Sequence, residues 1–155
     1  MKKYLVVTVL LGLAYACSNG SSEKKDNTSG SPAAAQPAGP SDETKGLGKF
    51  THVDLSPTLD KKLADGGKAI YDMKCAACHK LSNEKLVGPG WKDVTTRRKP
   101  EWIMNFVTNT EEMLNKDTSA QAMLEICMVK MPNQNLSDDD ARKVLEFMRE
   151  NDGVK

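Results

Sequence analysis

Apolar residues recur at helical spacing in two stretches, one in the middle of the chain and one near its C-terminus. The first stripe, which would cover one face of a helix, consists of Leu59, Leu63, Gly67, Ile70 and Tyr71. The second consists of Leu136, Ala141, Val144, Leu145 and Met148. Ser137 precedes three aspartates, so a capping side chain and favourable negative charge stand at the start of the second helix. Both stretches therefore predict amphipathic helices that bury one face.

Two further helices are predicted between these stripes. The first would begin at Pro100 and bury Trp102, Ile103, Phe106 and Val107. The second would begin with a capping box of Thr118 and Gln121 and carry Met123, Leu124 and Cys127. The predicted fold class is all-α.

The N-terminus has the pattern of an export signal. Lys2 and Lys3 precede an apolar run over residues 5–13, which small residues and Cys17 follow. Residues 14–16, Ala-Tyr-Ala, fit cleavage by ordinary signal peptidase, which would release a soluble protein. The site also resembles a bacterial lipobox, with Ala at a position where Leu is usual. We favour that second interpretation, in which Cys17 is lipidated and becomes the new N-terminus.

The chain therefore divides into three parts. Residues 1–16 would be the signal peptide, removed from the mature protein. Residues 17–46 would be the lipid-attachment cysteine and a flexible linker, because this stretch is rich in Ser, Gly, Pro and Ala and has almost no large apolar side chain. Residues 47–155 would form the folded domain.

Composition narrows the function classes. Of the 155 residues 39% are hydrophobic and only 5% aromatic, a thin supply for a core, to which a large apolar cofactor would add buried surface. The formal net charge of +1 gives no global field that would favour nucleic acid. The cysteines do not have the spacing of a disulfide framework; they are Cys17, Cys75, Cys78 and Cys127.

The stretch Cys75-Ala76-Ala77-Cys78-His79 is the chemical centre of the sequence. Two thiols three positions apart in a helical turn can add to the two vinyl groups along one edge of a porphyrin. The histidine that follows can then place an imidazole nitrogen on the iron. This pattern predicts one haem c, covalently attached through Cys75 and Cys78, with His79 as a metal ligand. An export signal agrees with it, because bacteria attach this haem outside the cytoplasm.

Three other chemistries use the same residue types. A thioredoxin-like dithiol needs a βαβ setting, and no strand-like alternation surrounds residues 75–79. A zinc site could recruit Cys127 and His52 besides the two thiols, but no second closely spaced ligand pair supports it. A disulfide between Cys75 and Cys78 would close a strained short loop. Haem attachment is the favoured interpretation.

From about residue 56 to 151 the sequence resembles the class I monohaem cytochrome c family. The resemblance lies in Gly67-Lys68-Ala69-Ile70-Tyr71, the attachment motif, Gly88-Pro89, Met131-Pro132 and a final amphipathic helix, all in the family's order. It implies about four to five helices wrapped around one covalent haem. It also implies that the first and last helices cross closely at Gly67, with Tyr71, Val144 and Phe147 packed around the crossing.

The sixth iron ligand follows from the same resemblance. Met128 and Met131 both lie near a helix end that leads into a loop, and the resemblance implies Met131 as the axial sulfur. Met128 and His52 remain as alternatives. The resemblance further implies that the Pro89 carbonyl accepts the second N–H of His79.

Other side chains could complete the haem site. Trp91 could donate to a haem propionate or simply pack in the wall, and Arg97 or Arg98 could pair with a propionate. Cys127 would be a small buried hydrophobe.

A six-coordinate haem leaves no position for a substrate, so we expect an electron-transfer protein rather than an enzyme. Its donor would be a quinol-oxidising complex and its acceptor a terminal oxidase or a nitrogen-oxide reductase. It would be a monomer that binds no nucleic acid and is anchored by lipid to a membrane, facing the periplasm or the cell exterior. The alternatives are a five-coordinate haem enzyme or gas or redox sensor, and a haem-bearing subunit of a larger membrane redox complex.

Charge suggests how a partner would dock. A basic cluster surrounds the attachment region and consists of Lys74, Lys80, Lys85, Lys92, Arg97, Arg98 and Lys99. Acidic residues outnumber basic ones from Glu101 onward. This asymmetry would steer an acidic partner toward the haem edge; a mixed solvated surface is the plain alternative.

Overall fold

The structure is a computed structural model that describes residues 43–155. The predicted signal peptide, Cys17 and most of the predicted linker lie outside this range. The described residues form a short 3-10 helix, η1 (Glu43–Lys45), and six α-helices with no strand. The α-helices are α1 (Lys61–Lys74), α2 (Val94–Arg97), α3 (Pro100–Thr108), α4 (Thr110–Lys116), α5 (Thr118–Cys127) and α6 (Asp138–Asn151). None of these helices is long and apolar enough to cross a membrane.

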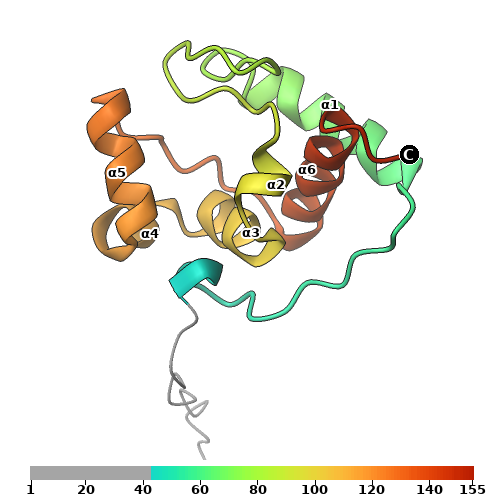
Figure 1. The fold of residues 1–155 in the computed structure, drawn as a ribbon, viewed down its shortest axis with the longest axis horizontal. Helices are drawn as coiled ribbons and strands as arrows, with labels where there is room; N and C mark the ends of the chain where they lie inside the picture. The colour runs from blue at the N-terminus through green and yellow to red at the C-terminus, as the bar shows by residue number, and fades with distance from the viewer. Residues whose placement is uncertain (1–42) are drawn as a thin grey trace, which may run out of the picture. The chain divides into compact units, whose positions relative to one another are not determined.

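The predicted all-α fold is confirmed, with more helices than the expected four to five. The additional ones come from the region after Asp93, where α2 is a single turn and α3, α4 and α5 are separate. Asn109 leaves helical geometry between α3 and α4, with φ −135° and ψ 45°, and Asp117 is extended between α4 and α5. These breaks divide residues 100–127 into three short helices, which follow one another in Figure 1.

Helices α1 and α6 cross at Gly67. A Cβ atom built on Gly67 would lie 2.0 Å from the carbonyl oxygen of Lys143 and 2.7 Å from Cβ of Phe147, so only glycine permits this approach. Next to the crossing, the rings of Tyr71 and Phe147 lie 5.4 Å apart. Figure 1 shows the two helices side by side. The predicted crossing is confirmed.

Side-chain caps fix where the helices begin. Ser137 Oγ accepts the amide of Asp140 at 3.1 Å, as the sequence predicted for α6. For α5 the expectation was wrong, because the cap is Asp117 rather than Thr118. Asp117 Oδ1 accepts the amide of Ala120 at 2.8 Å and the indole N–H of Trp102 at 3.2 Å. The hydrogen bond from Trp102 of α3 holds Asp117 at the capping position, and Thr118 is the first residue of the helix.

The sequence predicted that the folded region begins at residue 47, but ordered contacts begin before that residue. The buried amide of Asn105 accepts the backbone N–H of Phe50 and donates to the carbonyls of Phe50 and Lys45, each at 3.0 Å. The amide of Leu47 contacts the sulfur of Met113 at 2.9 Å. Residues 44–50 are therefore held against α3 and α4 rather than belonging to a linker.

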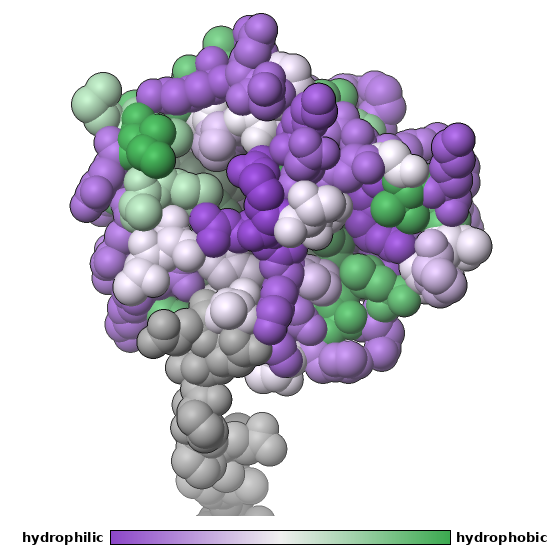
Figure 2. All heavy atoms as spheres, viewed as in Figure 1, coloured by the Kyte–Doolittle hydropathy of each residue, from purple (hydrophilic) through white to green (hydrophobic). Residues whose placement is uncertain are grey.

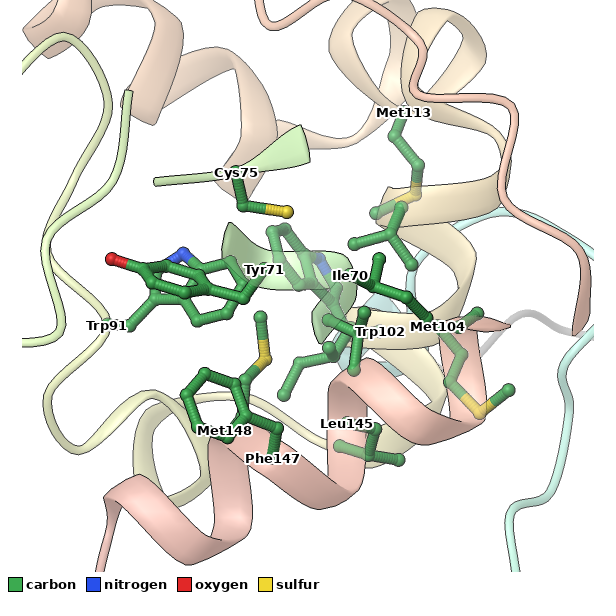
Figure 3. Close-up of a cluster of buried hydrophobic side chains, with 14 of the residues drawn as sticks. Ile70, Tyr71, Cys75, Trp91, Trp102, Met104, Met113, Leu145, Phe147 and Met148 are labelled. Carbon is green, nitrogen blue, oxygen red and sulfur yellow. The ribbon is translucent and has the colours of Figure 1, made fainter. Parts of the chain in front are cut away.

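The apolar core gathers where the helices meet (Figure 3). Tyr71, Trp91 and Phe147 lie together beside the attachment cysteine Cys75. Most of the surface in Figure 2 is hydrophilic, but apolar side chains are visible over α5. The large apolar side chains that are exposed include Leu86, Val87, Ile126, Met128 and Val129.

Candidate functional site

The attachment motif forms a tight turn at the end of α1. The carbonyl of Cys75 accepts the amide of Cys78 at 3.0 Å and the amide of His79 at 2.9 Å. This turn brings the two cysteines and the histidine to one end of the helix. Both cysteines are free thiols, so the disulfide alternative is not formed.

The Cys75 thiol is buried at the end of α1. Burial raises the pKa of Cys75 to about 11, although the positive charge of the neighbouring Lys74 acts in the opposite direction. Reactive cysteines of thioredoxin-like sites instead have a lowered pKa. The described residues also provide no βαβ unit. The lack of a βαβ unit among these residues therefore argues against the thioredoxin-like alternative.

His79 is held in one tautomer. Its Nδ1 lies 2.8 Å from the carbonyl oxygen of Pro89, as expected; because a carbonyl only accepts, Nδ1 carries the proton and Nε2 keeps a free lone pair. Burial lowers the pKa of His79, and the hydrogen bond to Pro89 opposes this effect only partly. The hydroxyl of Tyr71 donates to the His79 carbonyl at 2.6 Å, which fixes the backbone as well. The result is a neutral imidazole that is oriented to bind a metal.

Gly88 makes room for that imidazole. A Cβ atom at position 88 would lie 2.3 Å from Cε1 of His79 and 2.8 Å from its Nδ1. Any other residue would push the ring away from the Pro89 carbonyl. Gly88 therefore leaves space for the His79 ring, and Pro89 accepts its hydrogen bond.

Two open apolar pockets lie beside His79. They are two parts of one crevice, because five residues border both of them. The shared residues are His79, Pro89, Phe106, Met123 and Met131. Cys78 borders the first part, and Trp91, Arg97 and Arg98 border the second. The crevice is walled mainly by apolar side chains, with Lys130 at its first part and Arg97 and Arg98 at its second.

The structure separates the candidates for the sixth ligand. Met131 borders both parts of the crevice together with His79. Met128 has a left-handed backbone, with φ 60°, and its side chain is 83% exposed. His52 is also exposed and its Nε2 contacts Asp54 Oδ1 at 2.8 Å. Neither Met128 nor His52 borders the crevice, whereas Met123 borders both parts.

The remaining predicted site residues lie at the second part of the crevice. Trp91 is buried, with its ring 4.9 Å from that of Tyr71 and 5.7 Å from that of His79, which fits wall packing. Arg97 is engaged by the carbonyls of its own loop, including that of Lys92 at 2.9 Å. Arg98 lies over the ring of Trp102 at 4.6 Å. The two guanidinium groups are therefore held in place at the crevice border.

Cys127 is half-buried, rather than fully buried as expected, and borders the first part of the crevice. Within residues 43–155 no three His, Cys, Asp or Glu side chains come together as a metal-binding group. The zinc alternative, which needed Cys127 and His52 beside the two motif cysteines, is therefore not formed in this range.

The residues present fit a covalently attached haem. Cys75 and Cys78 supply the thiols, and His79 supplies a neutral nitrogen ligand with a fixed tautomer. The apolar crevice suits the body of a porphyrin, and the arginines at its border suit carboxylates. Sequence reasoning did not identify Phe106, Leu114 or Leu124 as crevice residues, since their helical spacing indicates burial but not the space that they face.

Comparisons with known proteins agree on one family. A family model described as cytochrome c matches residues 64–152. A cytochrome c-553-like protein of Synechocystis sp. is 27% identical over 84 residues, which are 50% of this chain and 80% of that protein. A cytochrome c from Rhodothermus marinus has a similar structure, with a TM-score of 0.68 and 31% identity over 71% of this chain and 94% of that one. An engineered form of the Rhodothermus marinus protein, bound to a carbene intermediate, has a TM-score of 0.64 and 30% identity over 71% of this chain and 95% of that one.

Proposed function

The chain belongs to the cytochrome c family, and from that premise we propose that it carries single electrons with His79 and Met131 as the two axial ligands of its haem c. The haem is attached through Cys75 and Cys78. One observation carries the proposal. The His79 imidazole, whose Nδ1–H donates a hydrogen bond to the Pro89 carbonyl, borders the same apolar crevice as the Met131 thioether. A thioether opposite an imidazole raises the haem potential and occupies both axial positions.

The haem supplies a one-electron redox couple, and this chain's residues determine the conditions under which it works. The Pro89 carbonyl holds His79 in position and makes its imidazole a more basic ligand for the iron. Phe106, Leu114 and Leu124 exclude water from the crevice. Arg97 and Arg98 offer positive charge to the carboxylates of the cofactor. A dry and rigid site of this kind reorganises little when the charge changes, which favours electron transfer.

The Met131→Ala variant tests the sixth ligand. We expect complete loss of the weak near-infrared sulfur-to-iron band of the oxidised protein, with the covalent haem spectrum in alkaline pyridine unchanged. The matched control is Met73→Ala, because Met73 is 76% exposed and should leave the band intact. Visible and near-infrared spectra of the protein, matured with haem, check both variants. A full band in Met131→Ala would contradict Met131 as the ligand.

The alternative function is a five-coordinate haem enzyme or sensor. The engineered relative from Rhodothermus marinus binds a carbene intermediate, so a similar fold can hold a small molecule. Binding of carbon monoxide to the reduced protein discriminates the two functions. Rapid binding by the unmodified protein would favour the alternative, whereas slow or no binding, with rapid binding only in Met131→Ala, would favour the electron carrier.

Docking is proposed at the face that carries the attachment region. Lys92 is exposed there beside the half-buried Cys127 and the exposed Ile126, which border the same surface hollow. Lys80 is paired with Glu84 at 2.7 Å, so part of the predicted basic cluster is neutralised locally. A partner with an acidic rim around an apolar centre would match such a surface.

Ionic strength tests this docking. The rate of electron transfer to an acidic partner should fall by roughly tenfold between about 0.01 M and about 0.1 M salt, because salt screens the attraction. Lys92→Glu should slow the reaction more than Lys62→Glu, which makes the same change of charge on α1. Stopped-flow kinetics measure these rates, with a small uncharged reductant as the salt-independent reference. A flat salt profile would remove electrostatic steering.

The wider setting remains as the sequence predicted it. We propose that the protein is exported, that Cys17 is lipidated, and that the linker after Cys17 tethers the folded region to a membrane. A quinol-oxidising complex would be the electron donor, and a terminal oxidase or a nitrogen-oxide reductase the acceptor. The tether supports this role because a carrier that alternates between two partners needs slack.

A further inference from the structure

Met131 is carried by a segment with little local support. Residues 128–137 connect α5 to α6 without regular secondary structure. Within this stretch the side-chain hydrogen bonds join near neighbours, such as that from Gln134 Nε2 to the Pro132 carbonyl at 3.0 Å. Only Ala120 is fully buried among the residues of α5. Contacts from outside must therefore hold this segment against the crevice.

Lys85 supplies one such contact. Its ammonium donates to the carbonyl oxygen of Ile126 at 2.9 Å, across 41 positions of the chain. Ile126 is in the last turn of α5, where carbonyls lack a partner in the helix and a cation is favoured. The backbone of Lys85 forms an isolated antiparallel bridge with His79. Lys85 thus links the segment that carries His79 directly to the end of α5.

Lys74 supplies the second contact. Its ammonium donates to the carbonyl oxygen of Gln134 at 3.0 Å, across 60 positions of the chain. Lys74 is the last residue of α1 and precedes Cys75, the first attachment cysteine. Gln134 follows Met131 by three residues. The two lysines therefore reach from the haem-attachment side to carbonyls that flank Met131 in sequence, that of Ile126 before it and that of Gln134 after it.

These are the only side-chain hydrogen bonds that the described part of the chain makes between residues 121–136 and residues 43–99. Neither lysine forms an ion pair with a carboxylate in this part of the chain, unlike the neighbouring Lys80, which pairs with Glu84. Their ammonium groups therefore donate to the backbone carbonyls of Gln134 and Ile126, on the other side of the crevice.

We propose that Lys74 and Lys85 are positioning residues that clamp the Met131 segment against the haem and keep its thioether on the iron. The proposal rests on the proposed His79 and Met131 ligation. A thioether is a weak, neutral ligand, and Met131 must move away with its segment before another ligand can reach the iron. Breaking the two lysine contacts is part of the cost of that movement, so their loss should make Met131 easier to displace.

Displacement of Met131 by imidazole tests the clamp. In the oxidised holoprotein, Lys74→Ala and Lys85→Ala should each raise the rate at which imidazole removes the sulfur-to-iron band by roughly two- to fivefold, the range for an exposed charged contact. The double variant should show roughly a tenfold increase, because one opening breaks both bonds. Lys85→Arg, which keeps a donor, should return most of the original rate.

The control is Lys62→Ala, an exposed lysine on α1 whose side chain makes no hydrogen bond within the described range. It should leave the imidazole rate unchanged. Rates equal to those of the unmodified protein in all lysine variants would overturn the clamp. A faster rate matched by an equal loss of global stability in denaturant would also overturn it, since that indicates a general structural role. Absence of the sulfur-to-iron band in the unmodified protein would instead refute the proposed ligation.

Discussion

Replacing Glu146 by glutamine is expected to lower the free energy of unfolding by about 3 kcal/mol. Glu146 lies in α6 and is fully buried. Its Oε1 accepts from Nη1 of Arg149 at 2.7 Å and from the backbone N–H of Asp60 at 2.9 Å. Its Oε2 accepts from Arg142. Glutamine keeps the shape but removes the charge, which leaves the buried Arg149 without its counter-ion.

Chemical denaturation of the holoprotein measures this change. Glu150→Gln is the matched control, because Glu150 pairs with Lys61 at 2.6 Å on the surface and its loss should cost less than about 1 kcal/mol. Equal losses in the two variants would show that the buried network adds nothing beyond a surface ion pair.

The same carboxylate should make stability sensitive to acid. Burial alone would raise the pKa of Glu146, but its hydrogen bonds from Arg142, Asp60 and Arg149 outweigh burial and hold the pKa below its ordinary value of 4.5. The stabilisation is therefore complete above that pH and is lost as the pH falls through the lowered value in the folded protein. The difference in unfolding free energy between the unmodified protein and Glu146→Gln should narrow on acidification below pH 4.5. A difference that stays constant there would contradict this assignment.

The Gly67→Ala variant should be less stable by about 2 kcal/mol. The new methyl group would clash with the Lys143 carbonyl oxygen, at 2.0 Å, and with Cβ of Phe147, at 2.7 Å. Neither atom can move without shifting α6, and forcing two packed helices apart costs about 3 kcal/mol. Alanine recovers about 1 kcal/mol through its higher helix propensity.

The neighbouring glycine gives a close control for this prediction. A Cβ atom on Gly66 would meet only the flexible side chain of Lys143, at 3.1 Å from its Cδ. Gly66→Ala should therefore leave stability unchanged or raise it by up to about 1 kcal/mol. Denaturant unfolding of both variants measures the contrast. A Gly67→Ala protein as stable as Gly66→Ala would show that the two helices separate at little cost.

Much of the fold and the centre of the site could be predicted from the sequence because they depend on residues close together in the chain. The spacing of Cys75, Cys78 and His79 defines the attachment turn by itself, and the apolar stripes define α1 and α6. The cap at Ser137 depends on a residue three positions away. In each of these cases the interaction lies within one or two helical turns, where chain geometry leaves few alternatives.

The tertiary structure decided the features that depend on residues far apart. Asp117 rather than Thr118 caps α5 because it also meets Trp102, and the folded region starts before residue 47 because Asn105 binds the backbone there. Glu146 lies outside the apolar stripe of its helix, and its contact with the start of α1 accompanies its burial.

The distal side of the crevice depended on packing in the same way. Met123 lies within α5 and Met131 in the loop after it, and helix periodicity does not tell which surface either thioether meets. The two lysine contacts join residues 41 and 60 positions apart, and surface lysines carry no local signal of a partner. The sequence by itself determined the covalent chemistry and the helices, because these depend on short-range geometry. The arrangement of charges and sulfur atoms around the crevice was decided only when the helices packed, because such contacts depend on the relative positions of distant segments.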